Sequence, residues 1–190
     1  MPILNDKNIR KYLINKLNNQ AIRPKALFEE LSVHNGNAIA DVVAVYNDTH
    51  CYEIKGDGDK IERCLKQGQY YNYAFGKITV VTTNRHLARA EKILPEFWGI
   101  MLAEENGEDI SLKPIRKASL NKDFDKTRAL LTLWKAEMLN IIEENSQNNI
   151  KNKSRKYLAQ LISHTKKKQE LRREISDSLI SRFYQCSSGV

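Results

Sequence analysis

Two short runs of β-branched and aromatic residues, 40–46 and 49–55, dominate the hydrophobic pattern of the chain. Each run is typical of a β-strand, and Asn47-Asp48 between them suits a tight two-residue turn, so the pattern predicts a β-hairpin. Because side chains alternate between the faces of a strand, Glu53 and Lys55 must share one face. We expect Asp41 to lie beside them on the neighbouring strand.

The rest of the pattern up to residue 115 places further helices and strands around this hairpin. Apolar residues at helical spacing, capping residues and a final glycine indicate the helices, and short β-branched or apolar runs indicate the strands. The predicted helices cover residues 5–19, 59–75 and 86–94, and the predicted strands cover 26–33, 78–83, 97–103 and 110–113. This order predicts an α/β fold around a small mixed sheet.

The composition changes near residue 114, and the rest of the chain has a helical pattern. A strongly amphipathic stretch predicts a helix over 124–143, a polar break follows at 144–149, and a basic stretch predicts helical structure over 154–184. Trp98 and Trp134 are expected in the core, and the tail from Cys186 is expected to fray. We therefore divide the chain into a core, residues 1–115, and a basic helical extension packed on it, residues 119–185.

The composition indicates a soluble protein with a polyanionic partner. The 190 residues carry a formal net charge of +8, and the isoelectric point is near 9.3, which favours nucleic acid as the partner. No apolar run approaches the length of a membrane helix, so no membrane association is expected. The three cysteines form no Cys-x-x-Cys pair and the N-terminus has no signal-peptide pattern, so we expect a cytoplasmic protein.

The predicted hairpin brings two carboxylates and an ammonium group to one patch of a short sheet. Such a grouping is costly unless a divalent cation or a phosphate is the missing partner. Carboxylate oxygens suit Mg²⁺, with Mn²⁺ as the alternative ion, so we assign Asp41 and Glu53 as metal ligands and the backbone carbonyl of Ile54 as a further ligand. Lys55 would hold the attacking water, lower its pKa and contact the phosphate.

Three other side chains are candidates for the same site. Glu30, or less well Glu29, could supply a further carboxylate to the metal. Gln67 on the following helix could orient the water or a phosphate, and Tyr71 one turn later could touch the backbone of the strand being cut. The alternatives are a cross-strand ion pair on a solvated sheet face and an ordinary helix surface.

The spacing of these residues resembles the PD-(D/E)XK nuclease superfamily. Asp41 is followed after eleven residues by Glu53-Ile54-Lys55, and Asp59, Arg63, Gln67, Tyr71 and Phe75 resemble the helix of a bacterial and phage subgroup akin to MmcB-type DNA-repair proteins. The resemblance covers about residues 5 to 103. It implies a restriction-endonuclease-like core of helix-strand-strand-strand-helix-strand order, dependence on Mg²⁺, DNA as the substrate, and Glu30 as the extra acidic position.

The chain departs from the subgroup at three places. Ala40 stands where the superfamily often has proline, and Ile39 stands where the subgroup often has arginine, so a phosphate or base contact from that position is lost. The sequence Gly56-Asp57-Gly58 predicts a looser loop after the lysine than usual. The resemblance does not extend to residues 119–185.

The C-terminal stretch contains a dense run of basic residues that we expect to contact nucleic acid. Glu170 is its one acidic residue over 151–173, so contact with the phosphate backbone is favoured over a merely solvated helix face. Such contacts would give affinity without sequence preference. The residues assigned to this role are Lys166, Lys167, Lys168, Arg172 and Arg173.

The sequence as a whole predicts a Mg²⁺-dependent phosphodiesterase that hydrolyses DNA, with Asp41, Glu53, Lys55, Gln67 and Glu30 in the catalytic site. Two alternatives stay open: a nuclease of the same fold that cuts RNA, and a catalytically silent module that binds nucleic acid or protein. A homodimer, and a host protein bound through the C-terminal helices, also stay open. Single-stranded, double-stranded and branched substrates stay open, as do endonuclease and exonuclease action.

Overall fold

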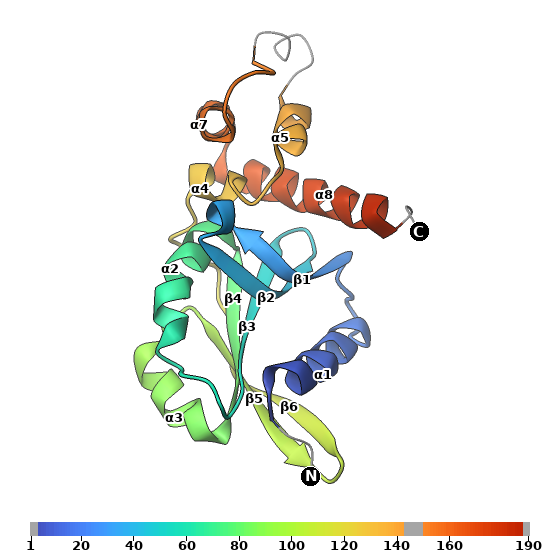
Figure 1. Cartoon of the computed structure of the whole chain (residues 1–190), viewed down its shortest axis with the longest axis vertical. Helices are drawn as coiled ribbons and strands as arrows, with labels where there is room; N and C mark the ends of the chain where they lie inside the picture. The colour runs from blue at the N-terminus through green and yellow to red at the C-terminus, as the bar shows by residue number, and fades with distance from the viewer. Residues whose placement is uncertain (1–3, 143–149, 188–190) are drawn as a thin grey trace.

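The computed structural model describes residues 4–142 and 150–187, which form a mixed six-stranded sheet and the helices around it (Figure 1). The strands are β1 Ala26–Val33, β2 Ala38–Val45, β3 Thr49–Lys55, β4 Lys77–Thr83, β5 Gly99–Asn106 and β6 Asp109–Arg116. The helices are α1 Asp6–Asn18, α2 Arg63–Ala74, α3 Asn84–Ile93, α4 Lys126–Leu130, α5 Lys135–Ile141, α7 Arg155–Thr165 and α8 Lys168–Ser187, with a 3₁₀ turn η1 at His34–Gly36. The predicted α/β class is confirmed.

The strands lie side by side in the order in which they occur along the chain. β1, β2 and β3 form an antiparallel meander, β3, β4 and β5 are parallel, and β6 returns antiparallel to β5. The parallel connections run through α2 and α3, as the helical crossover between parallel strands requires. β3 is therefore an interior strand, and its C-terminal end leads into the loop before α2.

Helices cover both faces of the sheet (Figure 1). α1 packs on one face through its predicted apolar stripe of Ile9, Leu13 and Leu17, together with alternate residues of β2 and β3 such as Val42 and Ile54. α2, α3 and the C-terminal helices share a second apolar core on the other face. The strands β3 and β4 are thus buried on both sides, which explains their nearly continuous apolar sequence.

The C-terminal helices pack over the β1–β2 end of the sheet (Figure 1) and differ in length from the prediction. The predicted helix over 124–143 is wrong as a single element, because α4 ends at Leu130 and α5 begins at Lys135. The predicted continuous stretch over 154–184 is also broken, between α7 and α8. The polar break predicted at 144–149 and the end of the predicted frayed tail lie outside the described residues.

Side chains from distant parts of the chain account for both breaks. Arg155 donates hydrogen bonds of 2.6 Å to the carbonyls of Leu131 and Leu133, where α4 has ended. Lys126 donates to the carbonyls of Ser163 and Lys166 at the end of α7. Because orphan carbonyls at a helix end need donors, these two cations stabilise helix termini that local sequence does not specify.

The short turns also differ from the predictions. α2 begins at Arg63, four residues later than predicted, because the Asp59 carboxylate accepts a hydrogen bond from the Gly56 amide in the preceding loop. The β2–β3 turn contains the three residues between Val45 and Thr49, rather than the predicted two. Within the described ranges no helix is long and apolar enough to cross a membrane.

Candidate active site

In both β1 and β2, the alternation of side chains between the two faces of the sheet is reversed at the same point. The strands pair at Glu29–Val42 and at Leu31–Ala40, but Glu30 and Asp41 between them make no ladder pair. Glu30 has a φ of +55°, in the left-handed region that non-glycine residues rarely adopt. On either side of this point Ala40 and Val43 face the same core, although they are an odd number of residues apart. A strained backbone of this kind is concentrated at functional sites.

Asp41 lies where β2 also separates from β3. The last ladder pair between these strands is Val42–Tyr52, and beyond it the Asp41 Oδ2 accepts a 2.7 Å hydrogen bond from the amide of Ile54. A side-chain carboxylate thus replaces the backbone acceptor that β2 no longer supplies. The predicted approach of Asp41 to the strand carrying Glu53 and Lys55 agrees with this geometry.

Glu53, Lys55 and Tyr71 form a buried hydrogen-bonded cluster behind Asp41. The Lys55 ammonium lies 2.5 Å from Glu53 Oε1 and donates to the Ile54 carbonyl at 3.0 Å. The Tyr71 hydroxyl lies 2.8 Å from Glu53 Oε2 and 2.7 Å from the Ile39 carbonyl. Glu53 is fully buried, so both of its oxygens are held by protein donors in a site screened from water.

Burial and like charge raise the pKa of Asp41 to about 7, because desolvation and the nearby Glu53 carboxylate both disfavour its ionised form. Burial acts most strongly and lowers the pKa of Lys55, but the attraction of and hydrogen bond to Glu53, together with further contributions that include Asp41, outweigh it, so the pKa of Lys55 is raised. The lysine therefore stays protonated at neutral pH. A carboxyl that titrates near neutrality beside a buried ion pair is typical of functional sites.

Arg10 of α1 belongs to the same site, and the sequence did not indicate it. Its guanidinium lies 2.9 Å from Asp6, 3.4 Å from Glu30 and 3.7 Å from both Glu29 and Asp41. The i,i+4 pair with Asp6 is the one contact that local spacing predicts. The other three carboxylates come from β1 and β2, so only the packing of α1 on the sheet brings them to the arginine.

The loop after Lys55 is held more firmly than its two glycines suggested. The Asp57 amide donates to the Leu4 carbonyl at 2.9 Å, and the Asp57 carboxylate accepts from Thr83 at 2.6 Å. A Cβ on Gly56 would lie 2.5 Å from the Leu4 carbonyl oxygen, so the close approach of the N-terminal segment requires glycine there. The predicted looseness of this loop is therefore wrong.

The structure brings together some of the predicted site residues and separates others. Asp41, Glu53, Lys55 and the Ile54 carbonyl converge, whereas Glu29 and Glu30 are largely exposed and reach the site only through Arg10. Gln67 lies half-buried on α2, one turn before Tyr71. The predicted contact of Tyr71 with nucleic acid is wrong for this structure, because Tyr71 is fully buried and its hydroxyl is engaged by Glu53 and Ile39.

The basic C-terminal run lies at the opposite end of β3 from Lys55. Arg172 is buried and forms a 2.7 Å ion pair with Asp48, which precedes the first residue of β3, about 20 Å from Lys55 along the strand. Lys166 pairs with Glu170 and Glu174. The predicted phosphate contact of Arg172 is therefore wrong, while Lys167, Lys168 and Arg173 are exposed.

Trp134 is also misplaced by the sequence prediction. It was expected in the core, but its side chain is 54% exposed, whereas Trp98 is buried as predicted. The difference follows from the break between α4 and α5, because Trp134 precedes α5 instead of continuing the buried face of a long helix.

The donor set suits a divalent cation with few protein ligands. No group of three or more His, Cys, Asp or Glu side chains arranged for a metal occurs in the described ranges. Two carboxylates, Asp41 and Glu53, and one carbonyl, Ile54, are nevertheless adjacent, and Mg²⁺ is commonly held by one or two carboxylates and several waters. Burial and, after it, repulsion by Glu53 raise the pKa of Asp41, and a cation bound between the two carboxylates would relieve the repulsion.

These features define an α/β protein with a buried carboxylate–lysine cluster where two strands of a mixed sheet separate. A family profile described as Bacteriophage P4 protein cII matches residues 2–189, and the chain belongs to this family. No curated protein gave a match. A solved structure of a Silicibacter pomeroyi protein of unknown function is 17% identical, with a TM-score of 0.39, over 55% of this chain and 66% of that one. This likeness is too weak to support an argument about function.

Proposed function

We propose that this protein is a metal-dependent nuclease that hydrolyses phosphodiester bonds of DNA, built on a restriction-endonuclease-like core. The observation that carries the proposal is the buried cluster of Glu53, Lys55 and Tyr71 beside Asp41. Burying an ion pair next to a second carboxylate contributes little to stability, so its presence here favours a chemical role.

Asp41, Glu53 and the Ile54 carbonyl would hold Mg²⁺ or Mn²⁺. The ion, when bound, would neutralise charge on the scissile phosphate and lower the pKa of a bound water. Tyr71 positions Glu53 by binding its second oxygen, and Ile54 positions Asp41 through its amide. Lys55 is protonated, so it acts as a hydrogen-bond donor to the attacking water and the phosphate rather than as a base.

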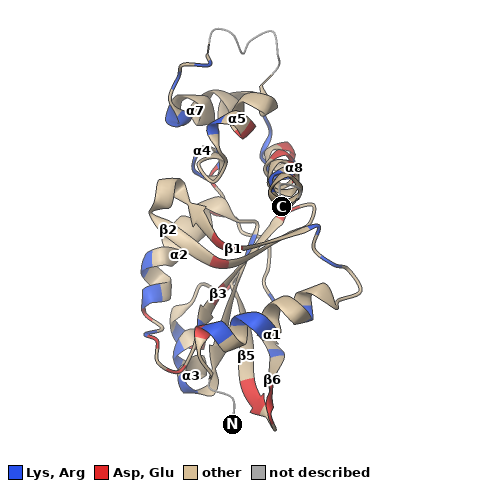
Figure 2. Ribbon diagram, turned by 45° about the vertical axis from the view of Figure 1, so that its right-hand side comes forward, with Lys and Arg blue, Asp and Glu red and all other residues tan. Residues whose placement is uncertain are grey.

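The charge distribution supports a nucleic-acid partner near this end of the sheet. Figure 2 shows acidic residues on β1 and basic residues along α2 and α3, the helices that follow the C-terminal ends of β3 and β4. Arg63 and Lys66 on α2 and Arg85 on α3 are exposed. Contacts from such side chains would place the phosphate backbone without reading its sequence.

The test is cleavage of labelled double-stranded DNA, single-stranded DNA and RNA, each with Mg²⁺, with Mn²⁺ and with EDTA. Wild-type protein should cut DNA only with metal, and Asp41→Asn and Lys55→Ala should each lower the rate about 100-fold or more. Lys60→Ala, which removes an exposed lysine nearby, is the matched control and should cut normally. Folding of every variant is checked by circular dichroism.

A second readout separates metal binding from turnover. Mn²⁺ should raise the unfolding midpoint of the wild type but not that of Asp41→Asn, because only a ligand of the folded state stabilises it. Cutting of RNA alone would favour the RNA-cleaving alternative. If no substrate is cut and all variants bind nucleic acid equally well, the nuclease proposal fails and a binding module takes its place.

A further inference from the structure

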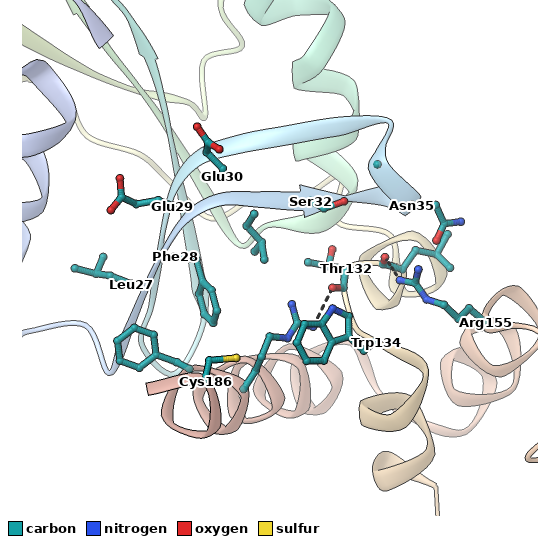
Figure 3. Close-up of a pocket in the computed structure, with 15 residues that line it drawn as sticks. Leu27, Phe28, Glu29, Glu30, Ser32, Asn35, Thr132, Trp134, Arg155 and Cys186 are labelled. Carbon is teal, nitrogen blue, oxygen red and sulfur yellow. Dashed lines mark hydrogen bonds between the residues drawn. The ribbon is translucent and has the colours of Figure 1, made fainter. Parts of the chain in front are cut away.

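A separate pocket of about 810 Å³ lies between the outer edge of β1 and the C-terminal helices (Figure 3). Residues 27–32 of β1 form one wall. The turn between α4 and α5, the first residue of α7 and the end of α8 form the other wall. The volume lies in the range of pockets that bind small molecules.

The pocket is lined by two arginines and two glutamates, and both arginines lie at the end formed by the C-terminal helices. Arg182 forms a buried ion pair with Glu137. Arg155 has no carboxylate within ion-pair distance among residues 4–142 and 150–187, and its Nε is buried without a hydrogen-bond partner in the same ranges. Burial and the neighbouring Arg182 lower the pKa of Arg155. Figure 3 shows Glu29 and Glu30 on the far side of the pocket from Arg155, so this end favours an anion.

Thr132 supplies a second unsatisfied group on the same wall. The residue is 5% exposed, and its Oγ1 finds no hydrogen-bond partner in the described part of the chain. A buried hydroxyl without a partner is costly and is rare in folded proteins. A ligand with polar acceptor atoms would satisfy it together with Arg155.

The aromatic residues of the pocket suit a flat ring. Trp134 is 54% exposed, with the Arg182 guanidinium 4.3 Å from its ring centroid. Phe28 points from β1 toward α8 (Figure 3), where its ring packs edge-on against Phe183 at 5.8 Å. Exposed aromatic rings of this kind bind nucleobases by stacking.

The edge of β1 is poorly suited to an added peptide strand. The left-handed backbone of Glu30 interrupts the extended conformation, and Glu29 and Glu30 place two charges in succession on this edge. Irregular backbone and charged side chains are devices that prevent strand addition at sheet edges. The occupant is therefore expected to contact side chains rather than the main chain.

We infer that this pocket binds a nucleotide, with its phosphate at Arg155 and Thr132 and its base against Trp134. A free mononucleotide and the phosphorylated end of a nucleic-acid strand share this chemistry. The inference does not rest on the proposed nuclease activity, because no residue of the Glu53–Lys55 cluster lines the pocket.

The experiment is isothermal titration of the full chain with deoxyadenosine monophosphate, deoxyadenosine and inorganic phosphate, and with a short single strand with and without a 5′-phosphate. The mononucleotide should bind about tenfold more tightly than the nucleoside or phosphate alone. A phosphorylated strand that binds more tightly than both the mononucleotide and the unphosphorylated strand identifies a strand end as the ligand. Equal affinity of the mononucleotide and the phosphorylated strand identifies the free nucleotide.

Two variants test whether the mononucleotide binds in this pocket. Thr132→Val removes a hydroxyl that has no described protein partner, so it should weaken binding about fivefold or more while leaving the unfolding midpoint unchanged or higher. Trp134→Ala should weaken binding by a similar factor. Tyr157→Ala removes an exposed aromatic ring outside the pocket and is the matched control. Absence of mononucleotide and strand binding, or affinity unchanged in both variants, overturns the inference.

Lys55→Ala distinguishes this inference from the proposed function. If that variant loses cleavage and still binds the mononucleotide, both proposals stand. If the wild type binds the mononucleotide but cleaves no substrate, the result supports nucleotide binding in the pocket and contradicts the nuclease proposal.

Discussion

Replacing Asp41 by asparagine should stabilise the protein at pH 8, although it removes a residue of the candidate active site. The asparagine side-chain oxygen can still accept the hydrogen bond from the Ile54 amide, which is 2.7 Å from the carboxylate. The substitution removes the charge that burial and Glu53 disfavour. A residue kept for function at the expense of stability should behave in this way.

The magnitude follows from the pKa of Asp41, which is about 7 in the folded protein against an ordinary value of 3.8. One pKa unit corresponds to 1.36 kcal/mol, so the ionised carboxylate destabilises the fold by at most about 4 kcal/mol. The folded state holds this proton more tightly than the unfolded chain does. The stabilisation that protonated Asp41 gives the folded state is therefore complete below about pH 4 and is lost as the pH rises to about 7.

The assay is urea denaturation of wild type and Asp41→Asn between pH 4 and pH 8, followed by tryptophan fluorescence, to which the buried Trp98 contributes. The free energy of unfolding of the variant should equal that of the wild type near pH 4. It should then exceed the wild-type value by an amount that grows up to about pH 7 and stays constant above it. Asp177→Asn, at an exposed position on α8, is the control and should show no such trend. A variant that is less stable than wild type at pH 8, or a difference independent of pH, would refute this reasoning.

Three further substitutions test the packing around the site. Tyr71→Phe should cost about 1–3 kcal/mol in urea denaturation, because it leaves an oxygen of the buried Glu53 without its donor; a neutral effect would contradict the hydrogen bond. Gly68→Ala should cost about 1–3 kcal/mol, because a Cβ there would lie 2.6 Å from the Trp98 ring, and unchanged thermal stability would mean that the ring moves freely. Arg10→Gln should destabilise the protein by about 1 kcal/mol at low salt and by less at high salt, and the same loss at both would exclude charge neutralisation as its role.

The acidic environment of Arg10 also bears on metal binding. A guanidinium lies against Asp41 and the carboxylates of β1, where a divalent cation would otherwise be attracted. Because Arg10 and a metal ion would be attracted by the same carboxylates, Arg10→Gln should alter the metal dependence of the unfolding midpoint as well as its salt dependence.

The sequence predicted most of the sheet because its signals are local. Alternation along β3 places Glu53 and Lys55 on one face whatever surrounds them, and the apolar stripe of α1 follows from the helical period. The hairpin of β2 and β3 follows equally from the short turn between two strand-like runs. These predictions need no knowledge of distant contacts.

Other features depended on contacts that no local pattern contains. The breaks after α4 and α7 are stabilised by Arg155 and Lys126, which lie more than twenty residues away in sequence from the carbonyls they bind. The burial of Arg172 against Asp48 joins residues 124 apart. An arginine in a basic run cannot be distinguished by sequence from its solvated neighbours until its partner is located.

The sequence by itself determined the α/β class, the β-hairpin and the shared face of Glu53 and Lys55, because side-chain periodicity fixes them within a few residues. Tertiary structure alone decided the reversed side-chain alternation at Glu30 and Asp41, the position of Arg10 beside Asp41, and the exposed position of Trp134. Each of these depends on how separate elements pack, and the free energy of packing depends on neighbours that are remote along the chain.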